Sequence, residues 1–175
     1  MTSLLIAGYK EFELGLRGNK DPRLAIIKKA IKRDLTSLIE EGVDWLVFSG
    51  NLGFEYWVLE VAKELQEDYP IQLASIFAFE NQGVHWNEAN QAKLATFKGL
   101  DYFKACYPSY EKPSQLAAYN QFLLDNTDGA YLFYDPEMPT KLSYLYEKMT
   151  NQDSFFIKRL NFDDLNEIAE TFSDF

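Results

Sequence analysis

An apolar run passes into a glycine-rich turn in the segment Trp45-Leu46-Val47-Phe48-Ser49-Gly50-Asn51-Leu52-Gly53-Phe54-Glu55. Beyond the turn, apolar residues recur at helical spacing: Phe54, Trp57, Val58, Val61 and Leu65. This pattern predicts a buried strand, a tight turn and an amphipathic helix. Glycines let a backbone approach a ligand closely, and the first N–H groups of a helix lack internal partners. Such a junction can hold an anion, typically a phosphate.

Glu55 falls in the first turn of the expected helix, where its side chain can face the same ligand. We consider it a candidate catalytic acid or base, or a partner for a ribose hydroxyl. The alternative is structural, because a carboxylate in the first helical turn complements the helix dipole. The preceding turn supplies four ligand-binding candidates: Ser49, Gly50, Asn51 and Gly53.

A second glycine turn follows a short apolar strand expected at residues 3–8 and reads Gly8-Tyr9-Lys10-Glu11-Phe12-Glu13-Leu14-Gly15. Its ligand-binding candidates are Gly8, Tyr9 and Lys10. The glycine would allow close backbone approach, and the lysine would neutralise a phosphate. Turn geometry alone and an exposed loop lysine are the structural alternatives.

Three ordered motifs resemble the YpsA-like family of bacterial proteins. They are G-Y-K-x-F-E-L-G at residues 8–15, S-G-x-L-G-x-E at residues 49–55, and a third motif at Asn120-Gln121-Phe122 and Tyr134-Asp135-Pro136-Glu137. The resemblance spans nearly the whole chain. It implies a Rossmann-like fold, related to the DNA-processing protein DprA and the cytokinin-activating LOG phosphohydrolases, and a nucleotide-type ligand. It implies no particular reaction, although a glutamate after a glycine turn is catalytic in the LOG-like relatives.

Strand and helix signals alternate along the chain. We expect strands at about 3–8, 44–49, 71–77, 101–106, 129–134 and 154–158. We expect helices at about 22–42, 54–68, 87–99, 113–126, 138–150 and 162–172, and a flexible insertion at 15–21. Six such alternations predict an α/β protein: one Rossmann-like three-layer domain over residues 1–175, with a mainly parallel sheet and helices on both faces.

Open parallel sheets bind ligands beyond the carboxyl ends of their strands, so the loops at that edge hold the remaining candidates. Phe79 and Trp86 follow the third strand and would stack on a base, or else pack their loop onto the core. Tyr134, Asp135 and Glu137 end the fifth strand as further ligand-binding candidates. A plain turn before the next helix is their structural alternative.

Composition limits the classes of function. The chain has 47% hydrophobic and 16% aromatic residues, which excludes a disordered protein. No run approaches the ~18 apolar residues of a membrane span, so we expect no membrane partner. The single cysteine, Cys106, excludes an internal disulfide framework and fits a reducing cytoplasm. With only one histidine, His85, we expect no metal site.

The net charge of −10 is unevenly distributed. Residues 1–33 hold eight of the 17 Lys and Arg and three of the 27 acids, a net +5 against −15 for the remainder. Long nucleic acid would be repelled by most of the surface, whereas a small anion near the N-terminal segment is compatible with this distribution.

Three hypotheses of function follow. The first is a sensing or regulatory protein that binds a nucleotide or nucleotide-derived small molecule at the carboxyl edge. The second is an enzyme that cleaves an N-glycosidic or phosphoribosyl bond with Glu55 as its carboxylate. The third is a protein-interaction module with a vestigial pocket. The sequence leaves the ligand, any turnover and any homo-oligomer open.

Overall fold

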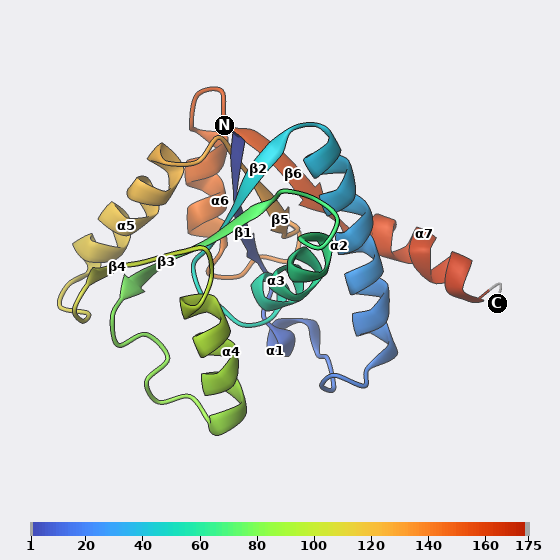
Figure 1. Ribbon diagram of the computed structural model, residues 1–175, viewed down its shortest axis with the longest axis horizontal. Coiled ribbons are helices and arrows are strands. Elements are labelled where there is room, and N and C mark those ends of the chain that lie inside the picture. The colour runs from blue at the N-terminus through green and yellow to red at the C-terminus, as the bar shows by residue number, and fades with distance from the viewer. Residues whose placement is uncertain (1, 174–175) are drawn as a thin grey trace.

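The computed structural model describes residues 2–173 and contains one six-stranded sheet in the order β4-β3-β2-β1-β5-β6 (Figure 1). Every strand pairing is parallel. The strands are β1 (Thr2–Gly8), β2 (Val43–Phe48), β3 (Gln72–Phe79), β4 (Tyr102–Tyr107), β5 (Gly129–Phe133) and β6 (Phe156–Leu160). The helices are α1 (Glu11–Leu14), α2 (Pro22–Glu40), α3 (Phe54–Leu65), α4 (Glu88–Lys98), α5 (Pro113–Asp125), α6 (Ser143–Thr150) and α7 (Phe162–Ser173).

Helices cover both faces of the sheet. On one face, Phe54 of α3 packs against the rings of Tyr131 and Phe133. Phe97 of α4 packs on the same face, against Phe48. On the other face, Tyr119 of α5 donates a hydrogen bond to the Ile76 carbonyl, and Tyr146 of α6 packs against Tyr134. The expected Rossmann-like α/β arrangement is therefore confirmed. None of the helices within residues 2–173 is long and apolar enough to span a membrane.

Two local expectations were wrong. The helix expected from residue 138 begins only at Ser143, because a residue before a proline is disfavoured in helical conformation and Pro139 follows Met138 directly. The loop expected from Gly8 onward contains the short helix α1, which is only four residues long. The segment expected to be a flexible insertion ends at Asp21, whose side chain accepts a hydrogen bond from the Arg23 N–H and caps α2.

The direction in which strands are added reverses at β1. The strands β2, β3 and β4 follow on one side of β1, and β5 and β6 lie on the other. In open α/β sheets, ligands bind in the crevice at this switch point, beyond the carboxyl ends of the strands. The residues that follow β1, β2 and β5 are therefore the candidates for a ligand site.

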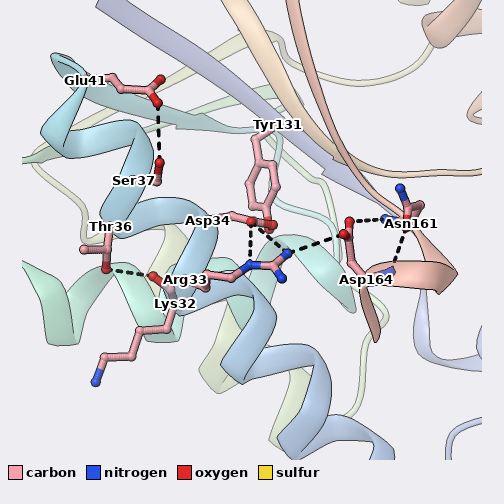
Figure 2. A network of polar contacts seen from close by, with 9 residues as sticks. All are labelled: Lys32, Arg33, Asp34, Thr36, Ser37, Glu41, Tyr131, Asn161 and Asp164. Atoms are coloured by element: carbon pink, nitrogen blue, oxygen red, sulfur yellow. Dashed lines mark hydrogen bonds and ion pairs between the residues drawn. The ribbon is translucent and has the colours of Figure 1, made fainter. Parts of the chain in front are cut away.

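A buried polar network fixes α7 on α2 and β5 (Figure 2). Asp34 is 3% exposed; it accepts a hydrogen bond from the Tyr131 hydroxyl at 2.7 Å and one from Arg33 at 3.2 Å. Arg33 also approaches Asp164 of α7 at 3.7 Å, and Asn161 caps that helix by accepting from the Asp164 N–H. A buried carboxylate requires such partners, because an unpaired one is costly.

Removing the Tyr131 hydroxyl should destabilise the fold. We expect Tyr131→Phe to lower the free energy of unfolding by about 1–2 kcal/mol, because Asp34 then stays buried with one donor fewer. Urea unfolding measures the effect, and Tyr144→Phe is the control because that side chain is 74% exposed. Equal midpoints for the two variants would contradict a stabilising role for the network.

Candidate functional site

The two glycine turns lie in direct contact. The Phe54 N–H donates to the Tyr9 carbonyl at 3.0 Å, which joins the β2–α3 turn to the end of β1. A Cβ atom on Gly53 would lie 2.6 Å from that same carbonyl oxygen and 2.7 Å from Lys10 Cα. A Cβ atom on Gly8 would lie 2.5 Å from the Phe54 ring. Both glycines are therefore required for the turns to touch.

The β2–α3 turn folds around the carboxylate of Glu55. This side chain is 2% exposed, and its Oε1 atom accepts from the N–H groups of Ser49 and Gly50 at 2.7 and 3.2 Å. Its Oε2 atom accepts from the Ser49 hydroxyl at 2.7 Å. Gly50 has a φ of 89°, which helps successive N–H groups converge on one anion. The anion that these donors hold is the protein's own carboxylate.

Burial raises the pKa of Glu55 to about 7, although the hydrogen bonds from Ser49, Asn51 and Gly50 act in the opposite direction. A carboxyl group with this pKa suits proton transfer near neutral pH. The Ser49 hydroxyl also accepts from the Asn51 side-chain amide at 3.0 Å. Because Asn51 is exposed, a chain of two side-chain hydrogen bonds connects the surface to the buried carboxyl.

Tyr9 closes the crevice at the switch point between β1 and β5. Its side chain is fully buried, and its hydroxyl accepts from the Asp135 N–H at 2.7 Å and donates to the Met138 carbonyl at 3.0 Å. Its ring packs against those of Phe133 and Tyr134. Tyr134 is buried as well. Both tyrosine side chains therefore pack in the interior.

Lys10, Asn51 and Glu137 are the exposed candidates at the carboxyl edge, and Asp135 is half-buried. The Lys10 N–H donates to Glu13 Oε1 at 2.7 Å, while its ammonium forms no ion pair with a residue in the described chain. Lys10 flanks the contact between the two turns, and Asn51 lies two residues before Gly53. The contact itself is buried, so the exposed side chains of Lys10 and Asn51 beside it are the accessible part of the candidate site.

Known proteins similar to this chain match it over nearly its whole length, including both glycine turns. The pattern that defines the YspA SLOG family matches residues 4–165, which include both glycine turns. The chain belongs to this family. Its sequence is 59% identical over 168 residues to a UPF0398 protein of Streptococcus thermophilus, covering 96% of this chain and 98% of the relative. A UPF0398 protein of a second strain of that species is 58% identical over the same shares.

In this YspA SLOG family member, the two aromatic candidates, Phe79 at the end of β3 and Trp86 in the loop that follows, both pack against other parts of the protein. Phe79 packs against Tyr107 and Tyr110 at the β4 side of the sheet. The Trp86 ring instead covers Gly83 within its own loop, where an added Cβ atom would lie 2.9 Å from the ring. Both rings are half-buried in these contacts, and their stacking on a base stays a prediction.

Two residues of the site were not anticipated. The Gln82 side-chain amide donates to the Ser49 carbonyl at 2.8 Å and so ties the loop after β3 to the β2–α3 turn. Tyr119 of α5 lies behind the same turn: its pKa is raised well above the usual value, first by burial and then by Glu55. The sequence around Gln82 gives no sign of this role, whereas Tyr119 directly precedes the Asn120-Gln121-Phe122 motif noted in the sequence.

Within residues 2–173 of this YspA SLOG protein, no group of three or more His, Cys, Asp or Glu side chains is arranged to hold a metal ion. The candidate site residues offer hydrogen bonding, charge and proton transfer. Lys10 can neutralise an anion, Asn51 can donate and accept hydrogen bonds, and Glu55 can gain or lose a proton near neutral pH.

Proposed function

We propose that this protein binds a nucleotide or nucleotide-derived small molecule at the carboxyl edge of its sheet and acts as a sensing or regulatory protein. The observation that carries the proposal is the contact of two glycine turns beside the exposed side chains of Lys10 and Asn51. The space beside Gly8, Gly50 and Gly53 is filled by the protein's own atoms, so the exposed Lys10 and Asn51 side chains would contact a ligand's phosphate. Membership of the YspA SLOG family supports the same ligand class.

The distribution of charge supports an anionic ligand at this edge. Lys10, Arg17 and Lys20 are exposed on the segment that joins β1 to α2. Arg17, Lys20 and Arg23 line an open hollow of about 470 Å³. Arg23 is paired with Asp21 at 2.6 Å, whereas Arg17 and Lys20 form no ion pair with another described residue. The acids Glu11, Glu13 and Asp21 balance the three basic residues of this segment, and the net +5 of residues 1–33 comes from α2. Arg17 and Lys20 are therefore the groups that would attract a phosphate here.

The hydrogen-bond chain from Asn51 suggests how a bound ligand would be sensed. A ligand that engages the Asn51 amide competes with its bond to the Ser49 hydroxyl. Ser49 in turn holds Glu55 in the first turn of α3, and α3 packs on α2. Occupancy of the surface site would thus alter the protonation of a buried carboxyl and the start of a core helix.

Cleavage of an N-glycosidic or phosphoribosyl bond is the second candidate, favoured by the pKa of about 7 at Glu55. Glycosidic cleavage usually employs two carboxyl groups in separate roles. Among the other carboxylates of these loops, Glu13 accepts from the Lys10 N–H and Asp135 from the Glu137 N–H, whereas the Glu137 side chain is exposed. Because Glu55 is also enclosed, the turn would have to open for it to reach a substrate. Binding without turnover therefore takes precedence.

A thermal-shift screen against nucleotides, nucleotide sugars and dinucleotides tests the proposal. A ligand that binds only the native state should raise the melting temperature, and calorimetry then gives its Kd. We expect Lys10→Ala to weaken binding by about 5–10-fold, because it removes one charge-assisted contact to phosphate. Lys98→Ala is the matched control, since that exposed lysine ends α4 at the opposite edge of the sheet.

The outcomes separate the three hypotheses. Chromatography of the incubated ligand detects turnover, and its loss in Glu55→Gln at unchanged affinity would favour the enzyme. If no compound of these classes raised the melting temperature, the interaction-module hypothesis would replace the proposal. Equal affinities of Lys10→Ala and Lys98→Ala would place the ligand elsewhere.

A further inference from the structure

A second hollow, of about 420 Å³, lies at the opposite edge of the sheet from the glycine turns. Its lining includes Ser3 at the start of β1, Trp45 near the start of β2, Ala74 of β3 and Tyr102 at the start of β4. The connection between α5 and β5 completes the rim with Asp125 and Asp128. No part of the proposed nucleotide site contributes to this hollow.

The hollow arises from the order of side-chain sizes across three neighbouring strands. Trp45 pairs with Gln72, two residues before Ala74, and Ala74 pairs with Tyr102. Because side chains alternate along a strand, Trp45, Ala74 and Tyr102 lie on the same face. The strands β2 and β4, which carry Trp45 and Tyr102, lie about 10 Å apart. The small side chain of Ala74 on β3 between them therefore forms the floor of the hollow. Tyr102 is 49% exposed and forms an open wall.

The rim carries only negative charge. Among residues 2–173, no Lys, Arg or His lines the hollow. Asp125 is exposed and ends α5, which has no basic residue in its last turn to balance the negative end of the helix dipole. Asp125 Oδ1 accepts from the Gln121 amide at 2.8 Å, and Asp128 Oδ2 accepts from the Ser3 N–H at 2.8 Å. The second oxygen of each carboxylate accepts no hydrogen bond from another residue in the range 2–173.

We propose that this hollow binds a small organic cation, an ammonium or guanidinium group on an aliphatic or flat stem. The two carboxylates and the helix terminus attract the positive group, and the ring faces of Trp45 and Tyr102 add cation–π attraction. The apolar floor accommodates the stem. The volume lies within the range of small-molecule sites, about 300–1,000 Å³. A phosphate would be repelled here, so this site is distinct in ligand chemistry from the one at the carboxyl edge.

Agmatine and putrescine are suitable probes, with NaCl of the same ionic strength as the control for bulk charge. The indole N–H resonance of Trp45, assigned with Trp45→Phe, should shift saturably in ¹H–¹⁵N spectra. The resonance of Trp57, a buried residue of α3, should stay in place. We expect Tyr102→Ala and Asp125→Asn each to raise the Kd of the probe about fivefold. Glu88→Gln removes the same charge at the carboxyl edge and should leave the Kd unchanged.

Circular dichroism first establishes that each variant is folded, and Asp125→Asn, on the surface, decides the matter if Tyr102→Ala unfolds. The proposal is overturned if the Trp45 resonance does not saturate by about 10 mM probe. It is also overturned if Asp125→Asn and Glu88→Gln bind alike, or if AMP shifts Trp45 as the cations do. Nucleotide binding at the carboxyl edge is tested separately, by the affinity of the Lys10→Ala variant for nucleotides.

Discussion

The wild-type protein should lose about 3 kcal/mol of stability, relative to Glu55→Gln, as the pH rises from about 4.5 to about 8. Burial raises the pKa of Glu55 from 4.5 to about 7 in the folded protein. The folded state therefore holds this proton more tightly than the unfolded chain does. That contribution to stability is fully present below the unfolded pKa and is lost as the pH rises through the folded pKa.

Urea unfolding of both proteins at a series of pH values measures this effect. Glu55→Gln keeps the size of the side chain and removes its titration, so the difference between the two curves cancels all other ionisable groups. If the hydrogen bonds from Ser49 and Gly50 outweighed burial, the folded pKa would be depressed. The stability difference would then change in the opposite direction with pH, and parallel curves would show that Glu55 does not titrate differently on folding.

Gly53→Ala should destabilise the fold by about 3 kcal/mol. Gly53 has a φ of +85°, which a residue with a Cβ atom rarely adopts, and the new methyl group would lie 2.6 Å from the Tyr9 carbonyl oxygen. It would also lie 2.7 Å from Lys10 Cα. The Tyr9 oxygen and the Lys10 Cα both belong to the backbone, so a side-chain rotation cannot relieve the clash. The two glycine turns would have to separate, and the hydrogen bond from Phe54 to Tyr9 would be lost.

Gly15→Ala is the matched control for this prediction. Gly15 has a φ of +66°, but no atom lies within 4 Å of its added Cβ. It should cost only the conformational strain, about 1–2 kcal/mol. Gly53 combines its φ with a ψ of −130°, a conformation essentially confined to glycine, whereas Gly15 has a ψ of 29° and lies in the left-handed region. The difference between the two variants in denaturant unfolding therefore measures the clash together with this additional strain. Similar losses in the two variants would show that contact between the turns does not require Gly53.

The sequence predicted the alternation of strands and helices because each element carries its own hydrophobic period and stop signals. Gly42, with a φ of +111°, follows the end of α2 and is a stop signal visible in the sequence. The error at residues 138–142 was also local, since Pro139 already argued against a helix there. The short helix α1 was missed because four residues are too few for a helical period to be recognised.

The environments of the candidate site residues could not be predicted in the same way. Tyr9 reads as a loop residue, and its burial depends on hydrogen bonds to Asp135 and Met138, more than 120 positions away. Gln82 joins the site through a carbonyl 33 positions earlier in the chain. Such contacts leave no local pattern in a single sequence.

By itself, the sequence determined the α/β class, the family, and the placement of two glycine turns after two buried strands. Local periodicity and the backbone freedom of glycine are properties of short segments, so they can be read along the chain. Only the tertiary structure decided that Gly53 touches the turn after β1, that Tyr9 fills the switch-point crevice, and that Glu55 is enclosed by its own turn. These outcomes depend on which strands become neighbours, and parallel pairing joins segments distant in sequence.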